Sequence, residues 1–214
     1  MDNDQRMSKR NLVIGAVTSV VIVAVALVLA LVVIPRLGGG EVELPEEVGG
    51  LTALDELVPP GADDDPEAQD RAAENRARQE DSREYSAEKI SEIFDGADAD
   101  QRSYADPDTI DPIYTVIAVA ADAGPLLVSN GFPDPEYLGL ALPREEWFEQ
   151  GDAECVGTRL ETVPAGEEPT EEQRAFGFLV CQRSSGSLSV RVSVNDGDVD
   201  AAVDLLDAVY TDLD

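Results

Sequence analysis

The longest apolar stretch of the chain runs from Leu12 to Ile34 and contains no charged residue. As an α-helix rising about 1.5 Å per residue it would be about 35 Å long, enough to cross a hydrocarbon core about 30 Å thick. Three basic residues precede this stretch, whereas only Arg36 closely follows it. Because basic residues favour the cytoplasmic side, residues 1–11 are predicted to be a cytoplasmic tail. Residues 12–34 are predicted to be a transmembrane helix that contacts the lipid bilayer, with the C-terminal domain outside the cell membrane.

A cleaved signal peptide is the main alternative for this stretch. Signal peptides have an apolar core of about 7–15 residues, followed by a cleavage site with small residues. The core here is longer, and the sequence from Ile34 to Leu37 lacks a small-x-small pattern. A single-pass protein with an uncleaved anchor is therefore the preferred interpretation.

Residues 35–65 are rich in glycine, proline and acidic residues, which predicts a flexible stalk. Within it, an LPxxVGGL segment is too apolar for a simple spacer. This segment could dock on the folded domain or on a partner, and its two glycines permit a tight turn. Alternatively, it only caps the edge of the domain. Its candidate interaction residues are Leu44, Pro45, Val48, Gly49, Gly50 and Leu51.

Residues 66–85 are predicted to form a polar helix. An aspartate before Pro66 and a glutamate after it favour a helix start. The segment is polar on all sides and gains an apolar face only near its end, before Gly96. Such a helix suits a spacer that enters a folded extracytoplasmic domain, predicted here for residues 86–214.

The pattern of this domain predicts an antiparallel sheet and a closing helix. Leu188, Val190, Val192 and Val194 alternate strictly with polar residues, and a Ser/Gly-rich segment before them indicates a hairpin. From Val199 onward, apolar residues recur with helical spacing. The predicted fold class is α+β, with about five antiparallel strands, one buried face and one or two helices packed against it. The expected strands are 99–104, 113–121, 153–163, 176–183 and 188–194.

The composition is strongly acidic. The chain has 45 Asp and Glu residues against 15 Lys and Arg residues, a net charge of −30. Such an excess excludes a nucleic-acid surface, which would require clustered basic residues. The sequence has no histidine, which removes the commonest general base and a leading zinc ligand. It also lacks the G-x-S-x-G, Walker and dinucleotide-binding patterns. We therefore expect neither an enzyme nor a cofactor-binding protein.

Two cysteines, Cys155 and Cys181, lie in the part of the chain predicted to be exported. Oxidation is permitted in that compartment, so we expect them to form a disulfide. The sequence has no CxxC pattern, and the bridge is therefore predicted to be structural.

Several short motifs resemble those of an uncharacterised family of single-pass membrane proteins from high-GC Gram-positive bacteria. The LPxxVGGL segment behind an N-terminal span is the first match. The others include Tyr104-Ala105-Asp106, Gly151-Asp152-x-x-Cys155 and Cys181-Gln182-Arg183, followed by an L-x-V-x-V strand and a final amphipathic helix. The resemblance implies a cytoplasmic N-terminus, an outside domain and no known activity. The acidic segment between the motif and the domain is longer here than the family pattern.

Two further clusters are candidates for binding. Trp147 and Phe148 lie in the densest aromatic stretch, with Phe132 and Tyr137 nearby; they could form an exposed patch, although packing in the core is favoured. The acidic loop 95–111 could hold calcium, but a solvated loop is the favoured interpretation, and no metal site is predicted. Half of a calcium loop starts at Asn195, yet Leu206 replaces its acidic final ligand.

Two functions compete on these observations. The first is an anchored binding or interaction module of the cell envelope, which contacts an unidentified envelope partner through its domain. The second is a structural or assembly partner that acts through the membrane helix and the LPxxVGGL segment. The first is preferred.

Overall fold

A computed structural model describes residues 42–57, 66–126, 131–195 and 198–213 of the chain. All of them belong to one compact unit, residues 41–214. The predicted tail and transmembrane helix, residues 1–34, lie outside the described residues. Among the described helices, none combines the length and apolar character that crossing a bilayer requires.

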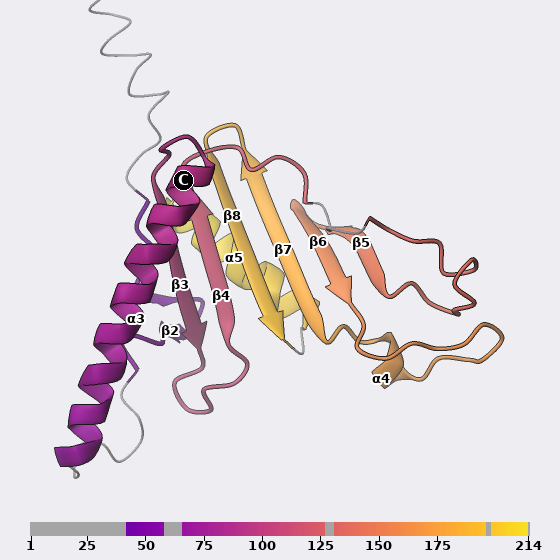
Figure 1. The fold of residues 1–214 in the computed structure, drawn as a ribbon, viewed down its shortest axis with the longest axis horizontal. Coiled ribbons are helices and arrows are strands. Elements are labelled where there is room, and N and C mark those ends of the chain that lie inside the picture. The colour runs from indigo at the N-terminus through magenta and orange to yellow at the C-terminus, as the bar shows by residue number, and fades with distance from the viewer. Residues whose placement is uncertain (1–41, 58–65, 127–130, 196–197, 214) are drawn as a thin grey trace, which may run out of the picture. The chain divides into compact units, whose positions relative to one another are not determined.

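The described residues form an α+β fold built on one eight-stranded antiparallel sheet, so the fold class is confirmed and the expected number of about five strands is wrong. The sheet order is β1-β2-β3-β4-β8-β7-β6-β5 (Figure 1). The strands are β1 (Glu47–Val48), β2 (Leu51–Ala53), β3 (Ala99–Ala105), β4 (Tyr114–Val119), β5 (Glu145–Gln150), β6 (Ala153–Thr158), β7 (Phe178–Ser185) and β8 (Leu188–Asn195). The helices are α3 (Pro66–Ile93), α4 (Glu171–Arg174) and α5 (Val199–Leu213).

The three strands that the sequence pattern missed lack the usual strand signal. β1 and β2 have only two and three residues, and β5 has the sequence EEWFEQ, in which apolar and polar residues do not alternate. The five expected strands all occur, and the helix expected from Val199 to Leu213 is confirmed as α5. Strand β8 lies between β4 and β7, so the final hairpin inserts into the centre of the sheet.

The first hairpin corrects the expected extent of the stalk. Residues 47–53 form β1 and β2 rather than a flexible spacer, because buried Leu44 and Val48 pack with the main core. Gly49 and Gly50 form the two-residue turn with φ of 60° and 84°. Both φ values are positive, as in the hairpin turns that match strand twist, and this conformation favours glycine.

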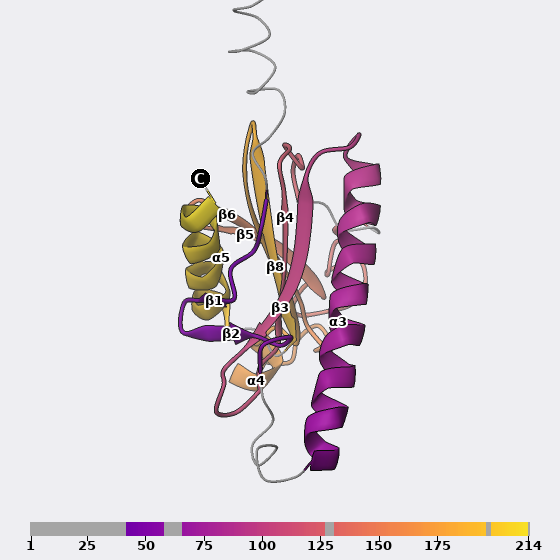
Figure 2. The same cartoon turned by 90° about the vertical axis from the view of Figure 1, so that its left-hand side faces the viewer.

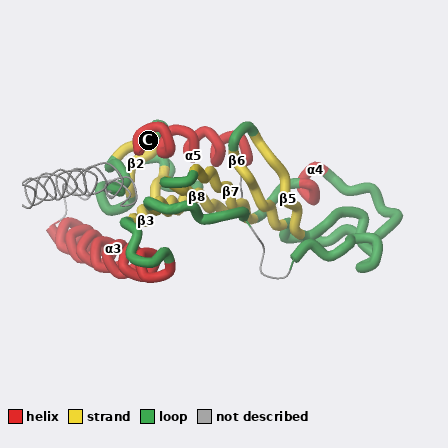
Figure 3. The backbone as a smooth tube through the Cα atoms, turned by 90° about the horizontal axis from the view of Figure 1, so that it is seen from above, coloured by secondary structure: helices red, strands yellow, loops and turns green. Residues whose placement is uncertain are grey.

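The helices lie on opposite faces of the sheet, whereas the sequence predicted a single buried face. Figure 2 shows α5 on one side and α3 on the other. α5 packs on β7 and β8 with six buried residues, Ala202, Val203, Leu205, Leu206, Val209 and Tyr210. α3 packs mainly on β3, at one side of the sheet (Figure 3). The main hydrophobic core therefore lies between α5 and the sheet.

The disulfide prediction is confirmed: Cys155 on β6 and Cys181 on β7 are bonded. The two residues lie directly opposite each other in the sheet, with Cα atoms 4.1 Å apart. Both are fully buried among the core residues that face α5. The bridge thus links two neighbouring strands on the packed face.

Reduction of this disulfide is expected to lower the free energy of unfolding by about 3–4 kcal/mol, because the closed loop limits the entropy of the unfolded chain. Urea unfolding followed by circular dichroism, with and without reductant, measures the difference. The reduced wild type keeps both sulfur atoms, so no cavity is created. An unchanged unfolding midpoint would contradict a stabilising role.

Candidate functional site

The most extensive network of buried charges joins the start of the described chain to β3. Four alternate residues of β3 and its preceding turn bind the backbone of residues 42–45. Asp98 accepts a hydrogen bond from the Val42 amide at 2.5 Å, and Asp100 accepts one from the Leu44 amide at 2.8 Å. Arg102 donates to the Leu44 carbonyl at 3.1 Å, and Tyr104 donates to the Pro45 carbonyl at 2.7 Å. This segment is therefore fixed along the strand by side chains.

Arg102 is the centre of this network. Its guanidinium donates to both carboxylate oxygens of Asp55, with Nε distances of 3.0 and 3.1 Å and an Nη2 distance of 2.6 Å. Only 7% of Arg102 is exposed, so the pair lies largely out of water. A guanidinium presents a planar, fixed fork of donors that can bind both oxygens of a carboxylate and a carbonyl, a geometry that the single ammonium group of a lysine does not provide.

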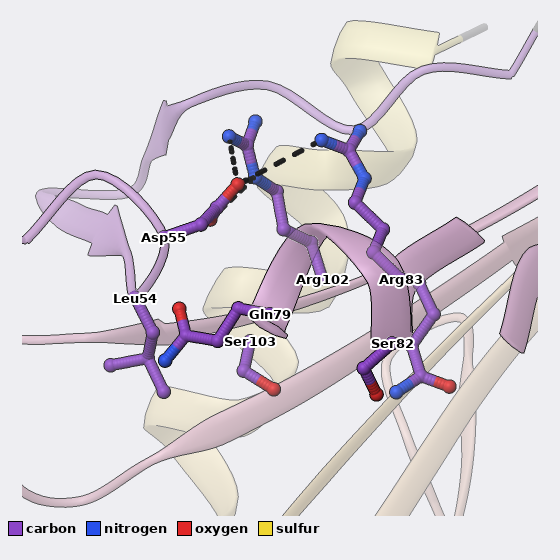
Figure 4. Close-up of a pocket in the computed structure, with 8 residues that line it drawn as sticks. Leu54, Asp55, Gln79, Ser82, Arg83, Arg102 and Ser103 are labelled. Atoms are coloured by element: carbon purple, nitrogen blue, oxygen red, sulfur yellow. Dashed lines mark hydrogen bonds and ion pairs between the residues drawn. The ribbon is translucent and has the colours of Figure 1, made fainter. Parts of the chain in front are cut away.

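Arg83 connects the polar helix α3 to the same cluster. Its Nε and Nη2 atoms donate to the two oxygens of Asp100 at 2.8 and 2.5 Å. Its Nη1 atom also lies 3.9 Å from Asp55, so the two arginines share that carboxylate (Figure 4). Arg76, one further α3 residue, donates to the Asp55 carbonyl at 2.8 Å. The helix is thus attached to the hairpin and to β3 by charged groups.

The electrostatics of the cluster keep its carboxylate and guanidinium groups ionised. Burial opposes the charge of Asp55, but the hydrogen bonds and positive charge of Arg102, with that of Arg83, lower its pKa below the ordinary value. The hydrogen bond to Asp100 is the main cause that raises the pKa of Arg83. Burial raises the pKa of Tyr104, whose phenol therefore stays protonated as the donor to Pro45.

Two cavities border this cluster, and Arg83 and Arg102, which line both of them, are already engaged. One has a volume of about 200 Å³ and lies between Leu54, α3 and β3. The other, of about 480 Å³, has several glutamates in its wall. Both arginines bind Asp55 or Asp100, so an anionic ligand would have to displace a carboxylate of the protein. The cluster is suited to holding elements together.

The structure separates the residues of the predicted LPxxVGGL interaction surface. Leu44 and Val48 are only 1% and 5% exposed, so their side chains belong to the core and the surface prediction is corrected for them. The Pro45 carbonyl is bonded to Tyr104, and Leu51 is half-buried. Gly49 and Gly50 alone are exposed, at the hairpin turn. The segment docks on its own domain.

Trp147 and Phe148 are neighbours on β5 and therefore point to opposite faces of the sheet. Phe148 is half-buried and stacks on Phe176 with ring centroids 5.5 Å apart. Trp147 is 41% exposed and lies opposite Val156 on the other face. The expected aromatic patch is thus divided between two faces. Phe132 and Tyr137, 47% and 89% exposed, lie in the loop before β5.

The acidic residues of loop 95–111 serve local structure. Asp98 and Asp100 bind the backbone of residues 42–44, and Asp106 accepts hydrogen bonds from the amides of Asp108 and Thr109. Asp198 likewise accepts from the first amides of α5. Within the described residues, no three acidic or cysteine side chains are arranged as metal ligands.

A second feature, which sequence reasoning missed, lies on the face of the sheet opposite α5. Val190, Val192 and Val194 of β8 point into the core, so Arg191 and Ser193 point the other way. Arg191 lies opposite Ile117 of β4 and Gln182 of β7. In Figure 1 this face of β8 and β7 is turned to the viewer, with α3 beside it and α5 behind the sheet. The alternation of apolar and polar residues along β8 predicts that Arg191 and Ser193 point away from the core, but it does not indicate what they do.

Comparison with protein-family models, with curated proteins and with solved structures finds no match. The proposals below therefore rest on the geometry of this chain.

The Arg102–Asp55 pair is expected to be essential to folding stability. Arg102→Leu leaves the largely buried Asp55 carboxylate without its main partner and should lower the free energy of unfolding by about 3–5 kcal/mol. The double variant Arg102→Leu/Asp55→Leu should recover part of that loss, because no buried charge then remains unpaired. The exposed pair Lys89–Glu92 provides the control, since Lys89→Leu should lower the free energy of unfolding far less. Equal losses in both pairs by urea unfolding would contradict this role.

The lowered pKa of Asp55 also predicts a pH dependence of stability. The stabilisation from this carboxylate should be complete above its unfolded pKa of 3.8 and lost as the pH falls through the lower folded pKa. The difference in unfolding free energy between wild type and Asp55→Asn should therefore be largest at neutral pH and shrink below pH 3.8. Urea unfolding at several pH values measures it. In an Arg102→Leu background the effect of Asp55→Asn on the unfolding free energy should change much less with pH. An effect of Asp55→Asn that is independent of pH in the otherwise wild-type protein would refute the assignment.

Proposed function

We propose that the chain is a membrane-anchored, extracytoplasmic binding module of the cell envelope, and not an enzyme. Residues 12–34 act as the anchor, and the domain presents a contact surface on the sheet face opposite α5. The observation that carries this proposal is the exposure of large apolar side chains beside that face. Trp147 is 41% exposed and Phe178 is 39% exposed. Tryptophan and phenylalanine are enriched in the surfaces through which proteins bind one another.

Three features support the proposal. The disulfide suits an oxidising compartment outside the cytoplasm. The sequence contains no histidine, and the charged groups of the largest buried cluster bind one another instead of facing a substrate. Only residues 35–41 separate the predicted span from Val42, whose amide is bonded to Asp98. The tether between anchor and domain is therefore much shorter in sequence than residues 35–65.

The alternative role, through the membrane helix and the LPxxVGGL segment, has less support. Leu44 and Val48 are buried in the domain core, so a partner could not contact their side chains while the domain is folded. The resemblance to uncharacterised single-pass membrane proteins fits either role.

Cysteine variants in intact cells test location and binding together. Phe178→Cys and Tyr85→Cys should both react with a membrane-impermeant benzophenone maleimide, whereas Ser8→Cys in the predicted tail should not. After illumination, Phe178→Cys should give a discrete crosslinked product that Tyr85→Cys, 63% exposed on α3, does not give. Labelling of Ser8→Cys in intact cells would refute the topology. Equal crosslinking from both positions would refute the binding surface.

A further inference from the structure

Arg191 differs from Arg102 and Arg183, the other arginines within the described strands, because each of those two pairs with a carboxylate. It makes no ion pair with any carboxylate in the described parts of the chain, although acidic residues outnumber basic ones threefold. Its guanidinium binds a neutral group instead: Nε and Nη2 donate to the Gln182 side-chain carbonyl at 3.1 and 2.6 Å. Partial burial lowers the pKa of Arg191, with no nearby acid to offset it. A half-buried cation is therefore left with its charge uncompensated.

The guanidinium is also held in a fixed orientation. Gln182 is only 3% exposed, and its amide nitrogen donates to the Gly124 carbonyl at 2.7 Å. That hydrogen bond fixes which way the Gln182 carbonyl points, and hence where Nε and Nη2 of Arg191 lie. The Nη1 atom makes no hydrogen bond to any described residue, and no buried polar atom of the described chain lacks a partner. The donors of Nη1 consequently face solvent.

Apart from Gln182, the nearest neighbours of Arg191 across the sheet are apolar or carry hydroxyl groups. Ile117 lies beside it on β4, and Thr115, Ser193 and Val180 form the next row across the sheet. That row continues through buried Val156 to exposed Trp147. Exposed Phe178 lies two residues before Val180 on the same strand face. The row of Arg191 itself continues through Gln182 to Glu154 and Glu149, so one preorganised cation lies among neutral and partly apolar side chains, with two acidic residues further across the face.

We propose that this face binds a segment of a partner protein that presents a carboxylate among apolar side chains, with Arg191 receiving the carboxylate. Charge complementarity identifies the occupant, because a second copy of this chain would bring another net charge of −30. The strong negative field around the protein repels acidic surfaces in general. A single carboxylate matched to Arg191 therefore fixes the register of a partner whose remaining surface is neutral or basic. This inference rests on the proposed function and specifies its partner.

Two peptides that differ in one group test the proposal on the full chain in lipid nanodiscs. The probe is acetyl-Lys-Val-Leu-Glu-Val-Leu-Lys-amide, and its control replaces the glutamate by glutamine. General attraction to an acidic protein favours the glutamine peptide, because its net charge is one unit more positive. Pairing with Arg191 favours the glutamate peptide by about fivefold in affinity. The chain has a single tryptophan, so the one indole N–H resonance in an NMR titration reports binding beside the site.

The variant Arg191→Gln should reverse the preference, so that the glutamine peptide binds more tightly. Arg144→Gln, which removes an exposed arginine before β5, should leave the preference for glutamate unchanged. Phe178→Ser should weaken both peptides equally, because it removes apolar contact without altering charge.

Three outcomes would overturn the inference: equal affinity for the two peptides, a preference that survives Arg191→Gln, or no binding of either. If free acetate shifts the Arg191 side-chain resonance as strongly as the peptide does, the site binds small anions and the partner assignment is wrong. The proposed function is tested separately: it is wrong if Phe178→Cys gives no crosslinked product in cells.

Discussion

The contact between Arg102 and Asp55 controls how the rest of the domain is assembled. Asp55 follows the first hairpin, Arg102 lies in β3, and Arg83 extends from α3 to the same carboxylate. Neither β1 nor β2 is long enough to be stable by itself, and α3 has almost no apolar face. Charged groups therefore attach α3 as apolar packing attaches α5, and they add to the core contacts that Val48 and Ala53 of the hairpin already make. Because a largely buried pair of this kind is strongly destabilising when one partner is lost, the hairpin, the helix and β3 should fold together.

The two faces of the sheet differ in the types of residue that they carry. The face under α5 is closed by apolar side chains, such as Leu206 and Val209, and includes the disulfide. The opposite face is covered by α3 mainly along β3, and its central rows mix hydroxyl and aliphatic residues with Arg191, Gln182 and Glu154. A sheet face of that composition is stable in water without a second complete layer, which permits it to act as a contact surface. Packing thus uses one face of the sheet, and the proposed binding uses the other.

Sequence reasoning succeeded where a local pattern carries the information. The alternation in β8 and the helical spacing in α5 are both visible within about fifteen residues, and both elements occur as predicted. The first hairpin could not be predicted in the same way, since its stability depends on residues that are distant in sequence. Arg102 and Asp55 are 47 residues apart, and with 45 acidic residues available no sequence rule selects this partner. The Trp147–Phe148 pair was placed in one patch because adjacency in sequence conceals the alternation of faces along a strand.

The scarcity of basic residues explains how the remaining arginines are used. Arg159 binds Glu146 at 2.7 Å and the Pro143 carbonyl at 2.8 Å, and it also covers the Phe176 ring at 4.6 Å. Arg183 pairs with Asp207 and covers the Tyr210 ring at 4.3 Å. Each of these side chains joins two or three elements, as the planar guanidinium permits. Of the arginines within the described strands, Arg191 is the one without a carboxylate partner, and the proposed partner segment would supply that carboxylate.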